Sequence, residues 1–175
     1  MATIDLVVLG MLKKESLSAY DIQKKVEYRN ISRWVKISTP SIYKKVLQLE
    51  EKGLISGRTE KEGKMPEKSV YSLTAAGLEE FDKLMKEISA KPINIFLDFN
   101  AVIVNLESMS EEDQKKCLDD IEKNIHMMRK SVEENIILKK NAPEIPVTGK
   151  GVLKQQFLLA EALEKWIAAL KEELC

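Results

Sequence analysis

The chain has 175 residues, enough for one compact domain or two small ones, and its hydrophobic content of 44% is sufficient for a core. Aromatic residues make up only 6% and charged residues 32%, a balance typical of helix-rich proteins with long exposed faces. The two isolated cysteines, Cys117 and Cys175, argue against a disulfide framework and indicate a reducing compartment.

The formal net charge of zero argues at first against a nucleic-acid partner. The charge is unevenly divided, however, because residues 1–78 hold 14 Lys and Arg against 9 Asp and Glu, whereas residues 79–175 hold 14 against 19. The two parts therefore carry net charges of +5 and −5. A basic first half and an acidic second half fit a protein that places one half on phosphates and turns the other away.

The chain begins with a short apolar segment. Ile4–Leu12 is interrupted by Asp5 and lacks a basic leader, so it is neither a signal peptide nor a membrane span. We therefore expect a cytoplasmic protein without a membrane partner, and we predict a buried helix at Thr3–Leu12. Ser18 and Asp21 form a capping-box pattern, with Asp in place of the usual Glu or Gln, which predicts the start of a second helix.

A third helix is predicted from Thr39 onward, after a connector at residues 29–38. Thr39 can cap this helix with its hydroxyl, and Pro40 suits the first helical position, where its missing N–H has no partner. Its predicted core positions are Ile42, Val46 and Leu49. Gly53 is predicted to end the helix in a left-handed conformation.

A second face of this helix is polar and cationic and contains no carboxylate. Its members are Ser41, Lys44, Lys45 and Gln48. Short polar and basic side chains on the N-terminal part of a helix can reach the base edges and phosphates of DNA. We interpret these four residues as candidate DNA contacts.

Two strand candidates follow, Leu54–Glu60 and Lys68–Leu73, with a polar turn at residues 61–67. A helix followed by a β-ribbon is the layout of a winged helix-turn-helix, which usually binds DNA. The cationic residues of this predicted wing and its flanks are Arg58, Lys61, Lys64 and Lys68. An ordinary solvated hairpin is the alternative, since charged loops are common.

Thr74 can cap a fourth helix, which is predicted to run to about residue 90. Lys91 and Pro92 interrupt it, because the residue before a proline is disfavoured in a helix. We place the domain boundary there. The predicted fold is mainly α with a small β-hairpin, with a winged helix-turn-helix DNA-binding domain at residues 1–91 and a helical domain at residues 92–175.

The second domain is predicted to be wholly helical. It begins with a dense apolar run at Ile93–Leu106 and continues with a helix from Ser110, with Asp113 as its capping partner, to about Lys140. This helix carries a heptad-like pattern at Leu118, Ile121, Ile125, Met128 and Val132. A last helix is predicted at residues 150–174.

The last helix has an apolar stripe that is too wide for a helix standing alone. The stripe consists of Leu159, Leu163, Trp166 and Leu170, with Phe157, Ala160 and Ile167 beside it. A twofold dimer would supply the partner surface that two long amphipathic helices need. The alternative is an antiparallel pair folded onto its own domain.

The run ISTPSIYKKVLQLEEKGLI (Ile37–Ile55) and the run YSLTAAGLEEF (Tyr71–Phe81) resemble the DNA-binding domain of PadR-family transcriptional regulators. The matching positions are Tyr43, Leu49, Glu50, Gly53, Tyr71, Leu73, Thr74 and Gly77. The second half is similar to that of the longer members, with residues 109–112 at a helix start and Trp166 in the last helix. Ala19 departs from the pattern, because the family usually has Gly before the tyrosine that is Tyr20 here.

The resemblance implies a homodimeric repressor of transcription that binds a palindromic operator in double-stranded DNA through its first domain. It gives the second domain the role of dimerisation, and it implies release by a small molecule. The complete set of candidate DNA contacts is Thr39, Ser41, Tyr43, Lys44, Lys45, Gln48, Arg58, Lys61 and Lys64. The family's effectors vary widely, so their identity does not transfer to this chain.

A pocket for a small aromatic effector is expected where the two domains or two subunits meet, because effector binding must alter the spacing of the DNA-binding domains. The candidate pocket residues are Phe96, Phe99, Met128 and Trp166. The alternative is that all four are simple core residues.

Few residues support an enzymatic function. The single histidine, His126, lies in a predicted helix, and such a histidine is more often a packed or solvent-edge residue than a ligand. The sequence contains no Cys/His cluster, phosphate-binding loop or nucleophile elbow. We therefore expect no catalysis, no cofactor and no metal. The alternative to a repressor is a winged-helix scaffold for protein interactions that does not bind DNA.

Overall fold

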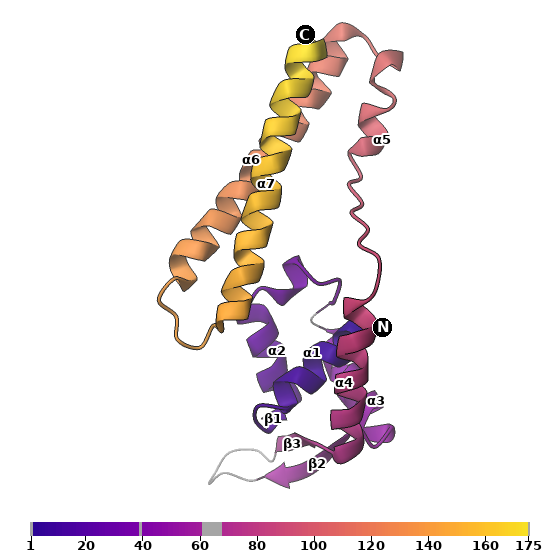
Figure 1. Cartoon of the computed structure of the whole chain (residues 1–175), viewed down its shortest axis with the longest axis vertical. Helices are drawn as coiled ribbons and strands as arrows, with labels where there is room; N and C mark the ends of the chain where they lie inside the picture. The colour runs from indigo at the N-terminus through magenta and orange to yellow at the C-terminus, as the bar shows by residue number, and fades with distance from the viewer. Residues whose placement is uncertain (1, 39, 61–67, 175) are drawn as a thin grey trace. The chain divides into compact units, whose positions relative to one another are not determined.

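The computed structural model describes residues 2–38, 40–60 and 68–174, and the chain divides into two compact units (Figure 1). The first unit covers residues 1–93 and the second covers residues 94–175. Each unit has a hydrophobic core of its own. The division lies close to the interruption that Lys91 and Pro92 make in the sequence pattern.

The first unit contains three helices, a hairpin and a fourth helix, in the predicted order. Its elements are α1 (Ala2–Leu12), β1 (Leu17–Ser18), α2 (Ala19–Tyr28), a 3-10 turn (Ile31–Arg33), α3 (Ser41–Glu51), β2 (Ile55–Glu60), β3 (Lys68–Leu73) and α4 (Ala75–Ser89). Strands β2 and β3 pair antiparallel, from Ile55 opposite Leu73 to Glu60 opposite Lys68. The predicted hairpin is therefore confirmed.

The short strand β1 has no counterpart in the sequence-based prediction. Leu17 pairs with Tyr71 and Ser18 pairs with Val70, so β1 adds a third antiparallel strand to give the order β1-β3-β2. Two residues are too few to show the alternation by which a strand is recognised. The extended conformation of β1 follows instead from its pairing with β3.

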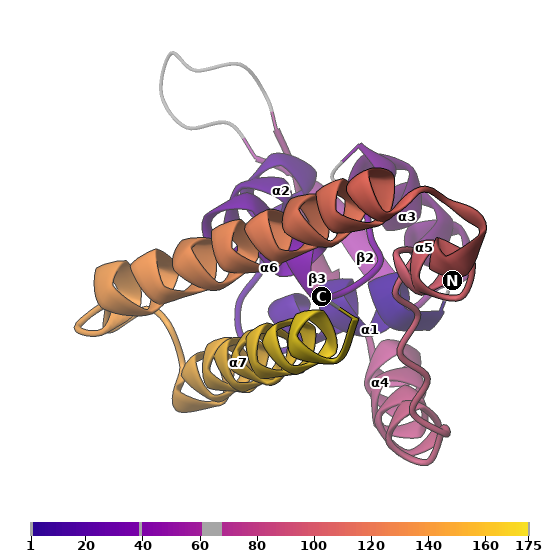
Figure 2. The same cartoon turned by 90° about the horizontal axis from the view of Figure 1, so that it is seen from above.

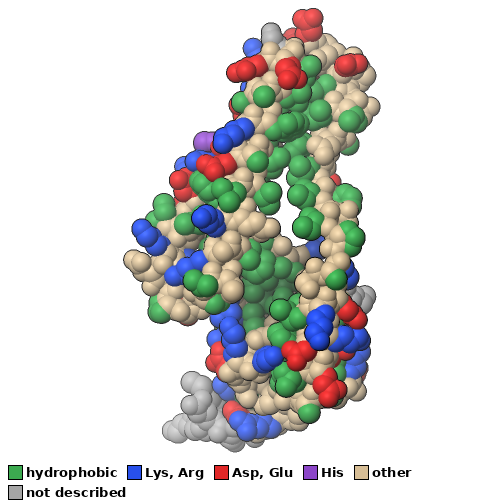
Figure 3. All heavy atoms as spheres, viewed as in Figure 1, with side chains coloured by type: hydrophobic (Ala, Val, Ile, Leu, Met, Phe, Trp, Pro, Cys, Tyr) green, Lys and Arg blue, Asp and Glu red, His purple; other side chains and the backbone are tan. Residues whose placement is uncertain are grey.

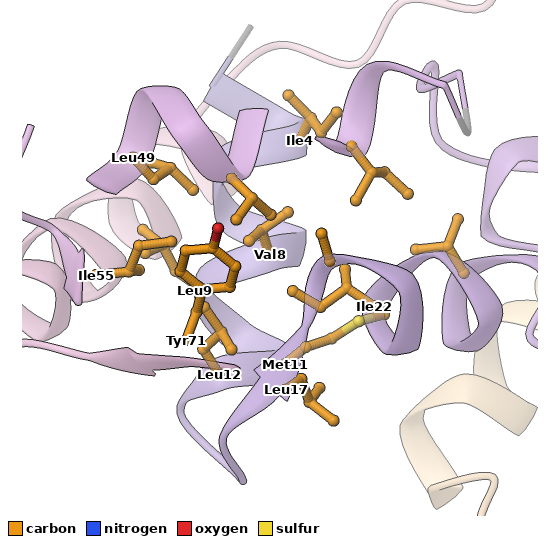
Figure 4. Packing of buried hydrophobic residues seen from close by; sticks show 14 of the residues in the cluster. Ile4, Val8, Leu9, Met11, Leu12, Leu17, Ile22, Leu49, Ile55 and Tyr71 are labelled. Carbon is orange, nitrogen blue, oxygen red and sulfur yellow. The ribbon is translucent and has the colours of Figure 1, made fainter. Parts of the chain in front are cut away.

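The core of the first unit lies among α1, α2, α3 and the sheet (Figure 4). Side chains from all three helices are almost completely buried, and they include Val8, Leu9, Ile22, Val26, Ile42, Val46 and Leu49. Burial of apolar surface, at about 25 cal/mol per Å², is the main term that stabilises this arrangement. The predicted core positions of α3 are confirmed, and α3 is held to the unit along one side.

Hydroxyl side chains cap α2 and α4 as predicted. At the start of α2, Ser18 Oγ accepts a hydrogen bond from the Asp21 N–H at 3.1 Å, and the Asp21 carboxylate accepts one from the Ser18 N–H at 3.2 Å. The Ser18 hydroxyl also lowers the pKa of Asp21 from its ordinary value. At the start of α4, Thr74 Oγ1 accepts from the Gly77 N–H at 3.0 Å.

Helix α3 begins at Ser41, one residue later than predicted. Pro40 precedes the helix rather than occupying its first position, and Thr39, the predicted cap, lies outside the described residues. Gly53, just after the helix, has a φ of +69°. This left-handed conformation suits glycine, which has no Cβ to clash, and it confirms the predicted helix end.

The second unit is a helical hairpin preceded by short helical turns. Its elements are α5 (Asn100–Ile103), a 3-10 turn (Leu106–Ser108), α6 (Glu111–Lys139) and α7 (Val147–Leu174). Helices α6 and α7 pack together and run in opposite directions (Figure 2). Ser110 Oγ accepts from the Asp113 N–H at 3.2 Å, which confirms the predicted start of α6. The buried seam includes Leu118, Ile121, Ile125, Val132, Leu153, Ala160 and Ile167.

The prediction of a wholly helical second half is wrong for residues 92–99, which form neither helix nor strand. Pro92 has no N–H to donate and disfavours the helical conformation in the residue before it. Asparagines also interrupt the apolar run that follows, and Asn105 Nδ2 donates to the Ala101 carbonyl at 2.7 Å. Such side-chain bonds compete with regular helix, so the run yields only the four-residue α5 and a 3-10 turn.

Candidate nucleic-acid interface

Helix α3 packs on the core by one side, so its other side is open to solvent. Tyr43 is 61% exposed and Lys44 is also exposed. Ser41 and Gln48 lie half-buried. The structure therefore brings four of the predicted contact residues to the open side of this helix or to its edges.

The first turn of α3 combines hydroxyl groups with an uncompensated helix end. Ser41 Oγ donates to the Ser38 carbonyl at 2.6 Å, and Ser38 Oγ donates to Ser41 Oγ at 3.1 Å. These bonds fix the entry of the chain into the helix. The first turn contains no acidic residue, so the partial positive charge of the helix N-terminus is available to an anion.

The prediction that Lys45 shares this open side is wrong. Its side chain is 9% exposed, and its Nζ lies 2.8 Å from Oδ1 of Asp5 on α1. At about 3.6 residues per turn, Lys45 lies between the directions of Ser41 and Leu49, so its position in the helix allows either side. The Asp5 carboxylate, which sequence spacing does not reveal as a neighbour, places it against the core.

The described part of the wing contains two of its predicted cations, Arg58 and Lys68, and of these Arg58 is a candidate DNA contact. Arg58 is exposed on β2, and its Nε lies 2.7 Å from Oε1 of Glu60, so its charge is partly neutralised within the strand. Lys61 and Lys64 lie outside the described residues, as Thr39 does. Lys68, at the start of β3, is exposed opposite Glu60.

A hydrogen bond joins the end of α3 to the wing. Glu50 Oε1 accepts from the Gly57 N–H on β2 at 2.9 Å, and Gly57 faces Tyr71 across the hairpin. A Cβ at Gly57 would lie 2.5 Å from Glu50 Oε1 and 3.0 Å from Tyr71 Cε1, so a larger residue there would displace the Glu50 carboxylate. Burial and the neighbouring Glu50 carboxylate raise the pKa of Tyr71. The sequence pattern singles out Glu50 and Tyr71 without indicating this contact, and it does not single out Gly57.

A second joint connects α4 to the turn that follows α3. Thr74 Oγ1 lies 2.8 Å from the Gly53 carbonyl and 3.0 Å from the Leu54 carbonyl, to which it can donate, and the Thr74 N–H donates to Leu54 at 3.2 Å. A Cβ at Gly77 would clash with the Leu54 carbonyl oxygen. The matching positions Thr74 and Gly77 are thus explained by a close packing of α4 on the chain between α3 and the wing.

The four effector candidates do not gather at one place in the second unit. Phe99 and Trp166 stack with their ring centroids 5.5 Å apart and pack against the core of this unit. Phe96 is 87% exposed and Met128 is 43% exposed. The structure thus joins two of the four and leaves two at the surface.

A hollow of about 370 Å³ lies on α6 and α7 and is lined by Asp119, Glu122, Lys123, His126, Glu164 and Ile167. Four of its polar side chains pair with neighbours: His126 Nδ1 lies 3.1 Å from Glu164, and Lys171 Nζ lies 2.6 Å from both Asp119 and Glu122. None of the four effector candidates lines this hollow.

The predicted dimerisation stripe on α7 is divided between the core and the surface of the second unit. Leu163, Trp166 and Leu170 are half-buried and pack against the core, whereas Leu159 is 43% exposed. Large apolar side chains elsewhere on this unit also remain exposed, as the green surface in Figure 3 shows.

Neither a membrane span nor a metal cluster is found within residues 2–38, 40–60 and 68–174. Among these residues, no helix combines the length and apolar character needed to cross a membrane. Nor do three or more His, Cys, Asp or Glu side chains of the described segments gather where they could hold a metal ion.

Comparison with known proteins identifies a family for the first unit. Residues 8–83 match the model of the Transcriptional regulator PadR-like family. The chain is also similar to the negative transcriptional regulator PadR of Bacillus subtilis (strain 168), with 31% identity over 80 residues. These residues make up 46% of this chain and 43% of that regulator, so the alignment spans less than half of the relative.

Similarity in structure extends over nearly the whole chain. The crystal structure of Bacillus subtilis PadR in complex with operator DNA has a TM-score of 0.82 at 20% identity, covering 99% of both chains. The same regulator in complex with p-coumaric acid has a TM-score of 0.78 at 17% identity, covering 98% of this chain and 94% of that one. The predicted fold class, a winged helix-turn-helix followed by a helical unit, is therefore confirmed. Residues 8–83 are thus similar to the PadR-like family of transcriptional regulators.

Proposed function

We propose that the protein is a homodimeric repressor that binds a specific operator in double-stranded DNA and leaves it when a small molecule binds. The observation that carries this proposal is the open side of α3, where Tyr43 and Lys44 are exposed at the end of a helix without carboxylates in its first turn. An α-helix fits the major groove, which is about 12 Å wide. Lys44 suits a phosphate, while the hydroxyl and amide groups of Ser41 and Gln48 suit base edges.

The similar proteins also support a repressor that binds DNA and a small molecule. The similar Bacillus subtilis protein is named a negative transcriptional regulator, and it has been solved both with operator DNA and with p-coumaric acid. We transfer from these names a DNA partner and a small aromatic effector to this chain. In this proposal residues 1–91 bind DNA, and residues 92–175 form the dimer and respond to the effector. The protein acts in the cytoplasm by binding alone, without a catalytic step or a cofactor.

Dimerisation is part of the proposal because one recognition helix reads too few base pairs to specify an operator. A twofold dimer presents two copies of α3 to a palindrome, with half-sites about one helical turn or more apart. The second unit offers exposed apolar side chains on its two long helices, including Met127, Met128, Ile137, Leu138, Leu158 and Leu159. We propose that the interface includes or adjoins the α7 stripe of Leu159, Leu163, Trp166 and Leu170.

The effector pocket is proposed near the aromatic residues of the second unit. Phe99 stacks on Trp166, and Phe96, three residues earlier in the chain, is exposed. An aromatic effector could therefore contact the exposed ring of Phe96 beside the packed ring of Phe99. A screen of small aromatic compounds by tryptophan fluorescence and by operator release would identify a ligand. Phe96→Ala should weaken the response to a confirmed compound while leaving the fold intact. An unchanged response in Phe96→Ala and in Phe99→Ala would place the pocket elsewhere.

The decisive experiment is a mobility-shift assay with the DNA upstream of the protein's own gene. We expect a retarded band at lower protein concentration than with a scrambled duplex of the same length and composition. Lys44→Ala should weaken binding and lower the slope of log affinity against log salt by about one unit for each phosphate that the variant no longer neutralises. Equal affinity for both duplexes would show that this fragment does not contain the operator, and the comparison would then be repeated with a broader panel of genomic fragments. Equal affinity throughout that panel would favour the scaffold alternative.

A further inference from the structure

The ion pair between Asp5 and Lys45 has no part in the fold's apolar packing and no part in the proposed DNA contacts. The two side chains are 16% and 9% exposed, and their charged atoms lie 2.8 Å apart. Removing two charges from water costs several kcal/mol per ion, which the attraction between them offsets only when their geometry is well defined. A contribution to stability alone therefore does not account for the pair.

We propose that the Asp5–Lys45 pair is a positioning device that sets the rotation of α3 about its own axis. The proposal rests on the DNA-binding function given above and assigns Lys45 a role through other residues, not a contact with DNA. The pair turns Lys44, the next residue along the helix, to the open side. It thereby decides which side chains of α3 meet the base edges.

The physical reason is that the pair joins two particular atoms. The other contacts of α3 with the core come from aliphatic side chains, chiefly Ile42, Val46 and Leu49, whose attraction depends on buried area and hardly on angle. Such a surface tolerates small rotations of a helix. The attraction between two charges weakens as they move apart, and Lys45 Nζ lies 2.8 Å from Asp5 Oδ1, so a rotation of α3 that separates these atoms is opposed.

The far end of α3 has a polar restraint of its own. There the Glu50 carboxylate accepts from the Gly57 N–H, which ties the helix to β2. Asp5 acts five residues earlier in α3, through Lys45, and ties the helix to α1. Two polar restraints on different neighbours, β2 and α1, define the rotation of a short helix better than either could alone.

The test compares Lys45→Met with Lys44→Met in the mobility-shift assay, using the upstream DNA fragment and a scrambled duplex. The two variants remove the same charge from adjacent residues of the same helix. Lys44→Met should lower the salt slope by about one unit for each phosphate left without its lysine. Lys45→Met should leave the salt slope at the wild-type value, yet reduce the ratio of operator affinity to scrambled-duplex affinity by roughly tenfold, the discrimination that one base contact supplies.

A double-mutant cycle measures the pair itself. Asp5→Asn, Lys45→Met and the double variant are compared by urea unfolding and by the same affinity ratio. Because both single changes break one interaction, their effects should be far from additive, and the double variant should discriminate no worse than Lys45→Met. Asp5→Glu, which keeps the carboxylate, should restore discrimination relative to Asp5→Asn. A purely structural role would alter stability without this pattern in the affinity ratio.

The outcomes separate the two proposals. If Lys45→Met lowers the salt slope as Lys44→Met does, Lys45 touches phosphate and the positioning role is overturned, while the DNA-binding function stands. If Lys45→Met keeps both slope and affinity ratio, or if the cycle is additive, the pair is merely structural. If the wild-type protein itself does not distinguish any operator from scrambled DNA, the proposed function fails first. Should Asp5→Asn fail to fold, the comparison of the two lysine variants alone decides.

Discussion

At the scale of single residues, Gly77 is closely packed where α4 passes the chain that leaves α3. A Cβ there would clash with the Leu54 carbonyl oxygen and lie 2.8 Å from Leu73 Cδ1. Because the first obstacle is backbone, side-chain rearrangement cannot relieve the clash. We expect Gly77→Ala to lower the free energy of unfolding by about 1–3 kcal/mol, measured by urea denaturation.

Gly151 in α7 provides the matched control for this substitution. No atom lies within 4 Å of a Cβ built at that position. Gly151→Ala should therefore leave stability unchanged or raise it by up to about 1 kcal/mol, because alanine favours a helix over glycine. An equal loss in the two variants would show that the clash at Leu54 is not the cause.

A single hydrogen bond joins two elements, α3 and the wing: Glu50 Oε1 accepts from the Gly57 N–H. Glu50→Ala removes the acceptor and should lower the free energy of unfolding by about 1 kcal/mol, the usual net contribution of a hydrogen bond. Glu50→Gln keeps an oxygen that can accept and should lose less. Circular dichroism during urea unfolding measures both, and equal behaviour of Gln and Ala at this position would contradict the joint.

At the scale of elements, the hairpin register is separable from the tip of the wing. The described pairs of β2 and β3 run from Ile55–Leu73 to Glu60–Lys68, on either side of residues 62–66 in the sequence. Shortening residues 62–66 should leave the thermal midpoint nearly unchanged, because loop tips tolerate deletion. It should still reduce operator affinity, since Lys64 is removed with the loop. If affinity survives the deletion, the predicted wing contact is absent.

Local patterns predict most of the first unit because they arise from near neighbours in the chain. The capping pairs Ser18–Asp21 and Thr74–Gly77 form within a single turn, and the left-handed Gly53 reflects the absence of a side chain. The hairpin strands alternate enough to be recognised. These features need no knowledge of distant residues, so their predictions are confirmed.

The failures of prediction depend on distant partners. Lys45 lies at the border between two faces of α3, and Asp5, forty positions earlier, decides its side. The strand β1 exists through its pairing with β3. In residues 92–99 the apolar content suggested a helix, although Pro92 opposes one. The DNA-contact and effector roles remain predictions, because they concern partners whose chemistry lies outside the chain.

At the scale of the whole molecule, the proposed function requires two chains. Within one chain the apolar side of α7 is only partly used, since Leu159 remains 43% exposed while Leu163 and Trp166 pack inward. Truncation after Lys150 should abolish dimerisation and operator binding together, because it removes α7 from Gly151 onward. The truncation also removes the helix that packs against α6. A single substitution that leaves α6 and α7 packed is therefore needed as a second test.

Leu159→Glu is that substitution, because Leu159 is exposed in the single chain and can be changed without opening the core. A carboxylate buried at a dimer interface without a partner is strongly unfavourable, so we expect the dimer dissociation constant to rise by roughly 100-fold or more. Gln155→Glu, at an exposed position of the same helix, adds the same charge and should leave the dimer intact. Sedimentation velocity across a concentration series measures both variants. Operator affinity should fall in parallel with dimerisation for Leu159→Glu, because each half-site alone is bound weakly. A dimer that survives both Leu159→Glu and the truncation would exclude α7 from the interface and require that the two copies of α3 be paired by another part of the chain.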